Sequence, residues 1–296
     1  MDENIIWIDA PLKELAAKIT KEGIECSTYI CKQLLSIYKY GKRKMKKAVS
    51  FKENEDRNQQ FEKINKLRMQ YQNSNNPIIS LDLKKKELIG NYYREGNCYC
   101  TKALPVYDHD FNTFSKGTIS PHGIYDLKKN IGYMTLSTSK DTSEFSCDCI
   151  KNWWINYGKE LYPNASSILI LCDGGGSNTS RGYLFKEDLQ KLVNEIGIEI
   201  KVAHYPPYTS KHNPIEHRLF PHITRALKGV LIDSIETMAE KIKTATTSKG
   251  LKVVVNIFNK VYETGRKASE EFCTNCTVIF DEILGKWNYT IVPQNR

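Results

Sequence analysis

The alternation of apolar and polar residues along most of the chain predicts the strands and helices of an α/β protein. Residues 78–82 and 167–172 are short, almost continuous apolar runs, which are typical of strands buried on both faces of a sheet. Ile198, Ile200 and Val202 alternate with polar residues and predict a further strand. Shorter strands are expected at residues 87–93, 98–103, 124–127 and 133–136.

Helical spacing of apolar residues predicts three helices between and after these strands. The first covers residues 141–157, the second covers residues 185–196, and the third begins at Asn213. Strands that alternate with helices late in the chain imply a central sheet with parallel members. The apolar faces consist of Phe145, Cys149, Trp153 and Tyr157 in the first helix and of Phe185, Leu189, Leu192 and Ile196 in the second.

The first 50 residues have a different pattern, in which two short helices are separated by a glycine. Gly23 ends the first helix, and Ser27 is a suitable N-cap for the second. Helix, short break and helix is the outline of a helix-turn-helix, although any small helical hairpin shares it. The inner faces are expected to carry Leu12, Leu15, Ala16 and Ile19 in the first helix and Ile30, Leu34 and Ile37 in the second.

A polar segment, residues 51–76, separates this head at residues 1–50 from the α/β body at residues 77–296. We expect it to be a helical linker that ends in a loop, since its last residues (QNSNNP, to Pro77) are typical of loops. The apolar residues that recur at helical spacing in it are Phe61, Ile64, Leu67 and Tyr71.

The chain has 43 lysine and arginine residues against 34 acidic ones, which gives a formal net charge of +9. Such an excess fits a polyanionic partner, most commonly nucleic acid, and equally fits a basic protein without one. A basic tract behind the predicted helix-turn-helix is expected to contact DNA phosphates, with a solvated charge run as the alternative. The tract consists of Lys42, Arg43, Lys44, Lys46 and Lys47.

The sequence contains no sign of export or membrane insertion. The longest apolar run near a motif is far shorter than the ~20 residues of a membrane helix, and the N-terminus lacks the pattern of a signal peptide. We therefore expect a cytoplasmic protein with no membrane partner, in which the nine cysteines are reduced. Cys273 and Cys276 form a CxxC pair, but no second pair at zinc-ligand spacing follows, so structural zinc is the weaker interpretation.

Three carboxylates occupy places where an open α/β sheet builds its sites. Asp82 ends the first strand of the body, Asp173 directly follows the strand at residues 167–172, and Glu216 lies in the first turn of the third helix. Side chains at the C-terminal ends of strands project from the rim of such a sheet. Three oxygen ligands at one point suit two magnesium or manganese ions, which catalyse in-line phosphoryl transfer.

Each carboxylate also has a structural explanation. Asp82 could pair with one of the lysines at residues 84–86. Asp173 precedes three glycines, and aspartate before glycine commonly forms a turn. Residues 213–216 match a capping box with proline at the first helical position, which would account for Glu216. The metal interpretation gains its weight from the combination of two strand ends and one helix start.

Two loops beside the carboxylates carry further candidates. Residues 174–176 are glycines that would let the backbone approach a phosphate closely, or that simply form a flexible loop. Residues 205–213 form a stiff loop that leads into the third helix. Lys211, His212 and Arg218 lie near the start of that helix, and we assign them to DNA phosphates, with solvated surface charge as the alternative.

Strings around the acidic residues resemble the DDE transposases of bacterial insertion sequences, and most of all their Rhodopirellula-type family. They are SLDLKKKELIGNY at residues 80–92, CDGGGSN at residues 172–178 and HYPPYTSKHNPIEHRLF at residues 204–220. GIYDLKKNIGYMTL at residues 123–136 and KWNYTIVP at residues 286–293 are similar to the same family. The resemblance runs from the first predicted helix to the C-terminus.

The resemblance implies an RNase H-like (integrase/transposase) catalytic core in which Asp82, Asp173 and Glu216 match the family's DDE triad. It implies nicking at transposon ends, followed by attack of the freed 3′-hydroxyl on target DNA. The head resembles the family's second helix-turn-helix, which would contact the terminal inverted repeats, with Ser27 and Thr28 among the contact residues. Such enzymes act on double-stranded DNA at the nucleoid, as a homodimer or a larger synaptic assembly.

The chain departs from the family pattern in two ways. Family members usually carry a further DNA-binding segment before the point where this chain starts, which implies a truncated copy. They usually have glycine and tryptophan where this chain has Tyr208 and His212. Two other functions therefore stay open: an RNase H-fold nuclease that cuts without strand transfer, and a DNA-binding remnant without catalysis.

Overall fold

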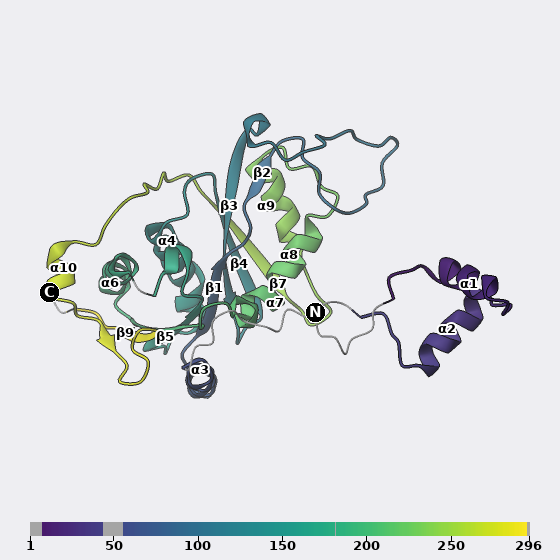
Figure 1. The fold of residues 1–296 in the computed structure, drawn as a ribbon. Coiled ribbons are helices and arrows are strands. Elements are labelled where there is room, and N and C mark those ends of the chain that lie inside the picture. The colour runs from purple at the N-terminus through teal and green to yellow at the C-terminus, as the bar shows by residue number, and fades with distance from the viewer. Residues whose placement is uncertain (1–7, 44–55, 181, 295–296) are drawn as a thin grey trace. The chain divides into compact units, whose positions relative to one another are not determined.

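The computed structural model describes residues 8–43, 56–180 and 182–294. The chain divides into two compact units, Met1–Phe51 and Lys52–Arg296 (Figure 1). From here on we call these units the head and the body, so that the body includes the predicted linker helix. None of the helices in the described residues is long and apolar enough to cross a membrane.

The helices and strands are shown in Figure 1. The helices are α1 (Leu12–Lys21), α2 (Thr28–Ile37), α3 (Arg57–Gln72), α4 (Ser143–Trp153), α5 (Lys159–Leu161), α6 (Tyr183–Ile196), α7 (Pro214–Arg218), α8 (Phe220–Ala226), α9 (Ile235–Lys243) and α10 (Glu270–Thr274). The strands are β1 (Ile78–Leu83), β2 (Glu87–Ile89), β3 (Gly117–Asp126), β4 (Ile131–Ser137), β5 (Ser167–Cys172), β6 (Glu199–His204), β7 (Lys252–Phe258), β8 (Ile279–Phe280) and β9 (Asn288–Ile291).

The head consists of two helices joined by a turn. Gly23 adopts a positive φ of +88° after α1, a conformation that glycine tolerates better than any other residue. Ser27 is the N-cap of α2, and its hydroxyl oxygen accepts a hydrogen bond from the backbone N–H of Ile30 at 3.2 Å. Both features follow the sequence prediction, while the assignment of the pair as a helix-turn-helix stays a prediction.

The predicted inner face of α2 is wrong. Ile30, Leu34 and Ile37 are 42%, 37% and 70% exposed, whereas Cys31 is buried. Because one residue corresponds to a rotation of about 100° around a helix, the buried side of α2 is turned by that angle from the predicted one. In the described part of the head, Ala16 and Cys31 are the buried hydrophobic residues.

The body is built on a mixed sheet with the strand order β7-β4-β3-β1-β5-β6-β9-β8, to which β2 adds by pairing with β3. β1, β5 and β6 are parallel, and β3 is antiparallel to both β1 and β4. β7 is parallel to β4 near one edge, and β8 and β9 form an antiparallel pair beside β6 at the other. The α/β class with parallel strands at the centre is therefore confirmed.

Some strand predictions differ from the structure. β5 covers the predicted run, and β3 and β4 are longer than predicted. β2 has only three residues, and residues 98–103 contain no strand. Every residue from 97 to 105 is exposed, so this segment has no apolar face that a sheet could bury.

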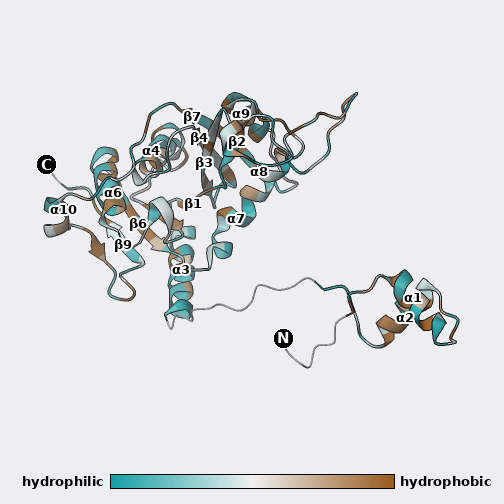
Figure 2. Cartoon of the chain, turned by 45° about the horizontal axis from the view of Figure 1, so that its top comes forward, coloured by the Kyte–Doolittle hydropathy of each residue, from teal (hydrophilic) through white to brown (hydrophobic). Residues whose placement is uncertain are grey.

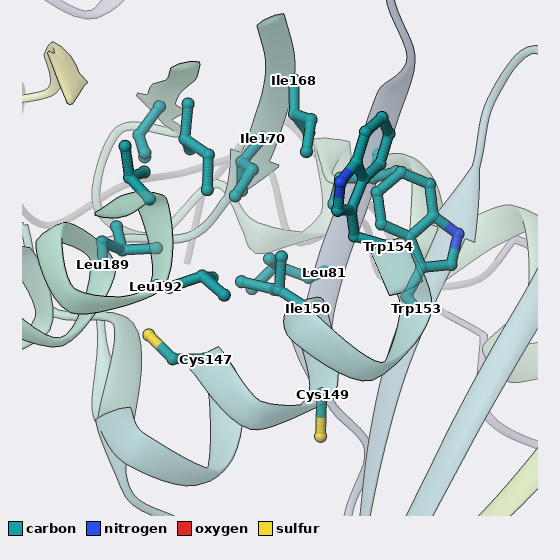
Figure 3. Close-up of a cluster of buried hydrophobic side chains, with 14 of the residues drawn as sticks. Leu81, Cys147, Cys149, Ile150, Trp153, Trp154, Ile168, Ile170, Leu189 and Leu192 are labelled. Carbon is teal, nitrogen blue, oxygen red and sulfur yellow. The ribbon is translucent and has the colours of Figure 1, made fainter. Parts of the chain in front are cut away.

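Helices cover both faces of the sheet (Figure 1). On one face α4 and α6 pack against β1 and β5, and Figure 3 shows this cluster with Trp153 and Trp154 at one side. The opposite face is covered by α3 over β1, β5 and β6, and by α7, α8 and α9 over β3, β4 and β7. The core thus leaves the C-terminal ends of β1 and β5 at the rim of the sheet.

α3 belongs to the body although its sequence is polar, as its largely hydrophilic colouring in Figure 2 shows. Gln60 is fully buried, and its Nε2 donates to the carbonyl oxygen of His204 at 2.8 Å. The side chains of Gln60 and Asn288 also exchange two hydrogen bonds, at 3.0 and 2.6 Å. A buried amide whose groups are all bonded fixes this helix to β6 and β9.

Candidate active site

Asp82 and Asp173 lie at corresponding positions of two neighbouring parallel strands. β1 pairs with β5 such that Ser80 faces Leu171. Two residues further along the same register, Asp82 near the end of β1 comes opposite Asp173, the first residue after β5. The ladder itself ends at Ser80 and Leu171, so it sets the direction in which the two residues leave the sheet.

Glu216 lies on α7, a helix of five residues that is docked on β1. The Ser80 hydroxyl accepts a hydrogen bond from the backbone N–H of Ile215 at 3.0 Å and donates one to Oδ1 of Asn213. Nδ2 of Asn213 donates to the carbonyl oxygen of Leu81 at 3.2 Å. Ser80 and Asn213 are fully buried, so these bonds fix the start of α7 against the strand.

Asp82 stands two residues beyond Ser80 and therefore points to the same side of β1. The pKa of Asp82 is raised to about 8, chiefly by burial and next by the charge of Asp173. The backbone N–H of Leu83, at 2.8 Å, opposes this rise, while the charge of Glu216 and a hydrogen bond with its side chain add to it. The three acidic residues singled out in the sequence are thus neighbours in the structure.

Burial also raises the pKa of Asp173, which the backbone N–H of Gly175 partly offsets from a distance of 3.4 Å. Asp173 therefore forms the turn that its glycines predict, and this does not remove it from the site. The ion-pair explanation of Asp82 is wrong, because Asp82 forms no ion pair with the lysines at residues 84–86. Lys84 instead contacts Glu87, with Nζ and Oε1 2.9 Å apart.

The capping-box explanation of Glu216 is wrong. Asn213 is the N-cap residue and Pro214 follows it in the first turn, but the Asn213 side chain makes no capping bond. It bonds to β1 instead, and the hydroxyl of Ser80 takes the place of the cap. Ser80 and Asn213 were not among the site residues predicted from the sequence. A serine in an otherwise apolar strand, two residues before the acidic one, was the available signal.

Two glycines of β3 and β4 allow α7 and α8 to approach the sheet. A Cβ atom at Gly123 would lie 2.7 Å from the Phe220 ring and 2.9 Å from Cδ1 of Ile215. A Cβ atom at Gly132 would overlap the side chain of Leu219. Real Cβ atoms do not come this close to other atoms, so a larger residue at either position would force the side chains of Phe220, Ile215 or Leu219 to shift.

The donor set fits magnesium or manganese by its chemistry. The charges of Asp173 and Glu216 both raise the pKa of Asp82, and divalent ions, which prefer hard oxygen ligands, would supply a compensating positive charge. Across the described ranges, no group of three or more His, Cys, Asp or Glu side chains is already arranged as a metal-binding cluster. The fit therefore rests on the type and proximity of the ligands, not on a preformed coordination geometry.

Three basic candidates surround the start of α7. Lys211 and His212 lie on the turn that precedes α7, and Arg218 is its last residue; all three are exposed. The His212 ring packs edge-on against Phe61 of α3, with 5.0 Å between the ring centres. Partial burial and the charge of Lys211 lower the pKa of His212, so it is largely neutral at pH 7.

The candidates in the head are exposed where they are described. Ser27 and Thr28 begin α2 on the surface, and Lys42 and Arg43 follow it. Lys44, Lys46 and Lys47 lie outside the described residues. Each described candidate is therefore accessible to a partner.

The cysteine pairs offer no zinc site in the described residues. Cys98, Cys100 and Cys273 are exposed free thiols, and Cys276 is half-buried. None belongs to a group of three metal-binding side chains among residues 8–43, 56–180 and 182–294.

Comparison with known proteins gives one family and several solved structures. A family model described as the Rhodopirellula transposase DDE domain matches residues 1–293. The Mos1 transposase paired-end complex with left transposon end has a TM-score of 0.47 and 15% identity, over 81% of this chain and 72% of that chain. The Mos1 mariner paired end complex with Mn has a TM-score of 0.46 and 15% identity, over 81% of this chain and 72% of that chain. The Mos1 Strand Transfer Complex has a TM-score of 0.45 and 16% identity, over 81% of this chain and 71% of that chain. No curated protein matches the chain.

Proposed function

The chain belongs to the transposase family described as the Rhodopirellula transposase DDE domain, and on this premise we propose that it cleaves DNA at insertion-sequence ends and transfers the strands to target DNA. The single observation that carries this proposal is the convergence of Asp82, Asp173 and Glu216. They come from two parallel strand ends and one docked helix, and burial together with the charges of Asp173 and Glu216 raises the pKa of Asp82 to about 8.

In this proposal the three carboxylates hold two divalent ions, magnesium or manganese. When bound, such ions supply positive charge for the attacking and leaving oxygens of a phosphoryl transfer. Asp82 gives up its proton when it binds a cation, since only the ionised carboxylate is a ligand. The β1–β5 register keeps Asp82 beside Asp173, and Ser80 with Asn213 keeps Glu216 facing them.

The arrangement of the central strands supports an RNase H-like core for residues 77–296. In the order β4-β3-β1-β5-β6, only β3 runs against its neighbours. Residues 51–76 form the connection to this core, and residues 1–50 form a helix-turn-helix head. The packing of α3 on the core through Gln60 supports a firm attachment of the connecting helix.

Double-stranded DNA is the partner, as terminal inverted repeats and as target. Lys211, His212 and Arg218 contact its phosphates beside the carboxylates, and the exposure of all three supports this role. The head contacts the repeats through Ser27, Thr28 and its basic tract. The enzyme acts in the cytoplasm at the nucleoid, as a homodimer or a larger synaptic assembly.

A plasmid nicking and joining assay tests the proposal. The purified chain is incubated with supercoiled plasmid and a duplex labelled at its 3′-hydroxyl end, with magnesium, manganese or EDTA. Metal-dependent nicking and a joined, labelled product are expected from the parent. Asp173→Asn should produce neither, while Glu240→Gln, which changes an exposed carboxylate on α9, should behave like the parent.

The assay also separates the two other functions. Nicking without any joined product would indicate a nuclease of the same fold. A folded parent that binds DNA but never cuts it would indicate a DNA-binding remnant, and the proposed catalysis would be wrong.

A further inference from the structure

The loop that carries Asp173 is fastened at its far end by a buried lysine. Between β5 and α6 the structure describes residues 173–180 and 182, and we call these residues the Asp173 loop. Lys186 on α6 is 3% exposed, and its Nζ donates to the carbonyl oxygens of Ser180 at 2.6 Å and Gly182 at 3.2 Å. This buried ammonium group holds the end of the loop against α6.

The near end of the loop is fastened by His204, the fully buried last residue of β6. Its Nδ1 lies 2.9 Å from the carbonyl oxygen of Asp173. Because a carbonyl oxygen only accepts, Nδ1 carries the hydrogen and donates it. Nε2 is then the acceptor, and it receives a hydrogen bond from the hydroxyl of Tyr289 at 3.0 Å. The carbonyl of Asp173 thus fixes the tautomer of His204, and the two hydrogen bonds together fix the orientation of its ring.

Tyr289 contacts both anchors of the Asp173 loop, Lys186 at its far end and His204 at its near end. It lies on β9, which pairs antiparallel with β6, and its side chain is fully buried. Nζ of Lys186 stands 4.8 Å from the centre of its ring, which is within the range of a cation–π interaction. Lys186, Tyr289 and His204 therefore form one continuous group behind the Asp173 loop, which we call the rear clamp.

We propose that the rear clamp sets the position of the Asp173 carboxylate for metal binding, and that its three members are positioning residues. Three consecutive glycines leave the Asp173 loop with much backbone freedom. Within the described residues, the hydrogen bond of the carboxylate itself is a long one, 3.4 Å from the N–H of Gly175. Its place is therefore decided by the anchors at the two ends. This inference rests on the proposed function, in which Asp173 binds a divalent ion.

Tyr289→Phe tests the clamp, because it removes the hydroxyl that orients His204 and keeps the buried ring. The measured quantity is the affinity of the whole chain for Mn²⁺, followed by the electron paramagnetic resonance signal of the free ion. Loss of a supporting hydrogen bond behind a metal ligand typically costs 10–100-fold, so we expect affinity to fall about tenfold. Lys186→Met frees the other end of the loop and should lower the affinity as well.

A matched control is Tyr125→Phe. Tyr125 is also fully buried, and its hydroxyl donates to Oδ1 of Asn130 at 2.9 Å, beside the turn between β3 and β4. Its variant should keep the Mn²⁺ affinity of the parent. Melting curves of both variants separate a loosened loop from a loss of folding, because each substitution removes one buried hydroxyl.

The outcomes distinguish the clamp from the proposed function. A parent that binds no Mn²⁺ would overturn the proposed metal site and the clamp with it. Parent-like affinity in both Tyr289→Phe and Lys186→Met would overturn the clamp alone. If Tyr289→Phe melts below the assay temperature, the affinity of Lys186→Met decides, and an equal loss in Tyr125→Phe would also count against the clamp.

Discussion

Asp173 and Glu216 contribute to the same candidate site, but the fold holds them there in different ways. Asp173 follows a buried strand, and the backbone ladder between β1 and β5 places it opposite Asp82. Glu216 lies on a helix of five residues that no ladder fixes. Its place depends on the hydroxyl of Ser80 and on the absence of a side chain at Gly123.

The difference teaches which parts of the site tolerate substitution. A strand register is the sum of many backbone hydrogen bonds, so a single side chain rarely shifts it. A short helix docked through a few side-chain contacts moves when one contact changes. Apart from the rear clamp behind Asp173, the strand-borne half of the site (Asp82 and Asp173) should therefore respond mainly to loss of its own carboxylates. The helix-borne half (Glu216) should also respond to each of the contacts that dock α7.

The largest effect is expected when any one carboxylate is removed. Asp82→Asn, Asp173→Asn and Glu216→Gln should each reduce metal-dependent DNA cleavage at least about a thousandfold, which corresponds to about 4 kcal/mol of the barrier. Initial cleavage rates and melting curves measure the effect and the folding. Equal losses would mean that the three act as one unit, whichever way they are held. Loss of folding in all three would support a purely structural role instead.

A smaller effect, confined to the helix-borne half, is expected from Gly123→Ala. Its Cβ atom would collide with the Phe220 ring and the end of the Ile215 side chain. Because both side chains are buried, we expect α7 to move outward and to take Glu216 with it. Overpacking of this kind costs about 1–3 kcal/mol of stability. Misplacement of a catalytic group by about 1 Å costs up to about a hundredfold in rate, so we expect a loss of roughly ten- to a hundredfold.

A second substitution tests the cause of that loss. Ile215→Val deletes the Cδ1 atom that lies 2.9 Å from the added methyl group. The double variant should recover part of the cleavage rate and part of the melting temperature. No recovery in either would mean that α7 does not move as described, and that Gly123 matters for another reason.

Ser80→Ala should have a still smaller effect on the same half. It leaves the N–H of Ile215 and Oδ1 of Asn213 without the Ser80 hydroxyl in a fully buried place, which costs about 1–3 kcal/mol. Ser120→Ala is a matched control, because Ser120 is 2% exposed and its hydroxyl bonds only to the carbonyl oxygen of Ser139. Both variants should lose stability, but only Ser80→Ala should also lose cleavage activity. Equal cleavage activity in the two variants would mean that Ser80 does not position Glu216.

The strand-borne half was also the part that the sequence predicted best. Residues 78–82 and 167–172 are apolar because both faces of a parallel strand are buried, so the pattern is visible without the fold. Asp82 and Asp173 could therefore be placed at strand ends from the sequence alone. β7 was not predicted, because its side chains are half-buried along most of its length and give no clear alternation.

The contacts that complete the site could not be predicted. Ser80 meets Asn213 across 133 residues of sequence, and His204 meets Tyr289 across 85. No local pattern carries such pairings, which depend on the order of the strands. The same limit explains the error in α2, since its inner side is decided by which residue meets α1 rather than by apolar spacing alone.

The smallest expected effect concerns Asp82, which stands between the two halves. Its pKa of about 8 in the folded chain lies above the ordinary value of 3.8. The resulting stabilisation is fully present below pH 3.8 and is lost as pH rises through about 8, because the unfolded chain then holds fewer protons than the folded one. Without divalent ions, the melting temperature should fall by a few degrees more between pH 6 and 8 in the parent than in Asp82→Asn, which lacks this proton.

Two further variants divide that pH dependence between the halves. The charge of Asp173 raises the pKa of Asp82 more than the charge of Glu216 does, so Asp173→Asn should flatten the fall more than Glu216→Gln. Magnesium binds the ionised carboxylates and should raise the melting temperature of the parent more at pH 9 than at pH 6. The reverse order of the two variants would mean that the docked helix, rather than the neighbouring strand, governs the charge at Asp82. Parent and Asp82→Asn curves of equal slope would mean that Asp82 is ionised throughout, and that its neighbours lie farther away than described.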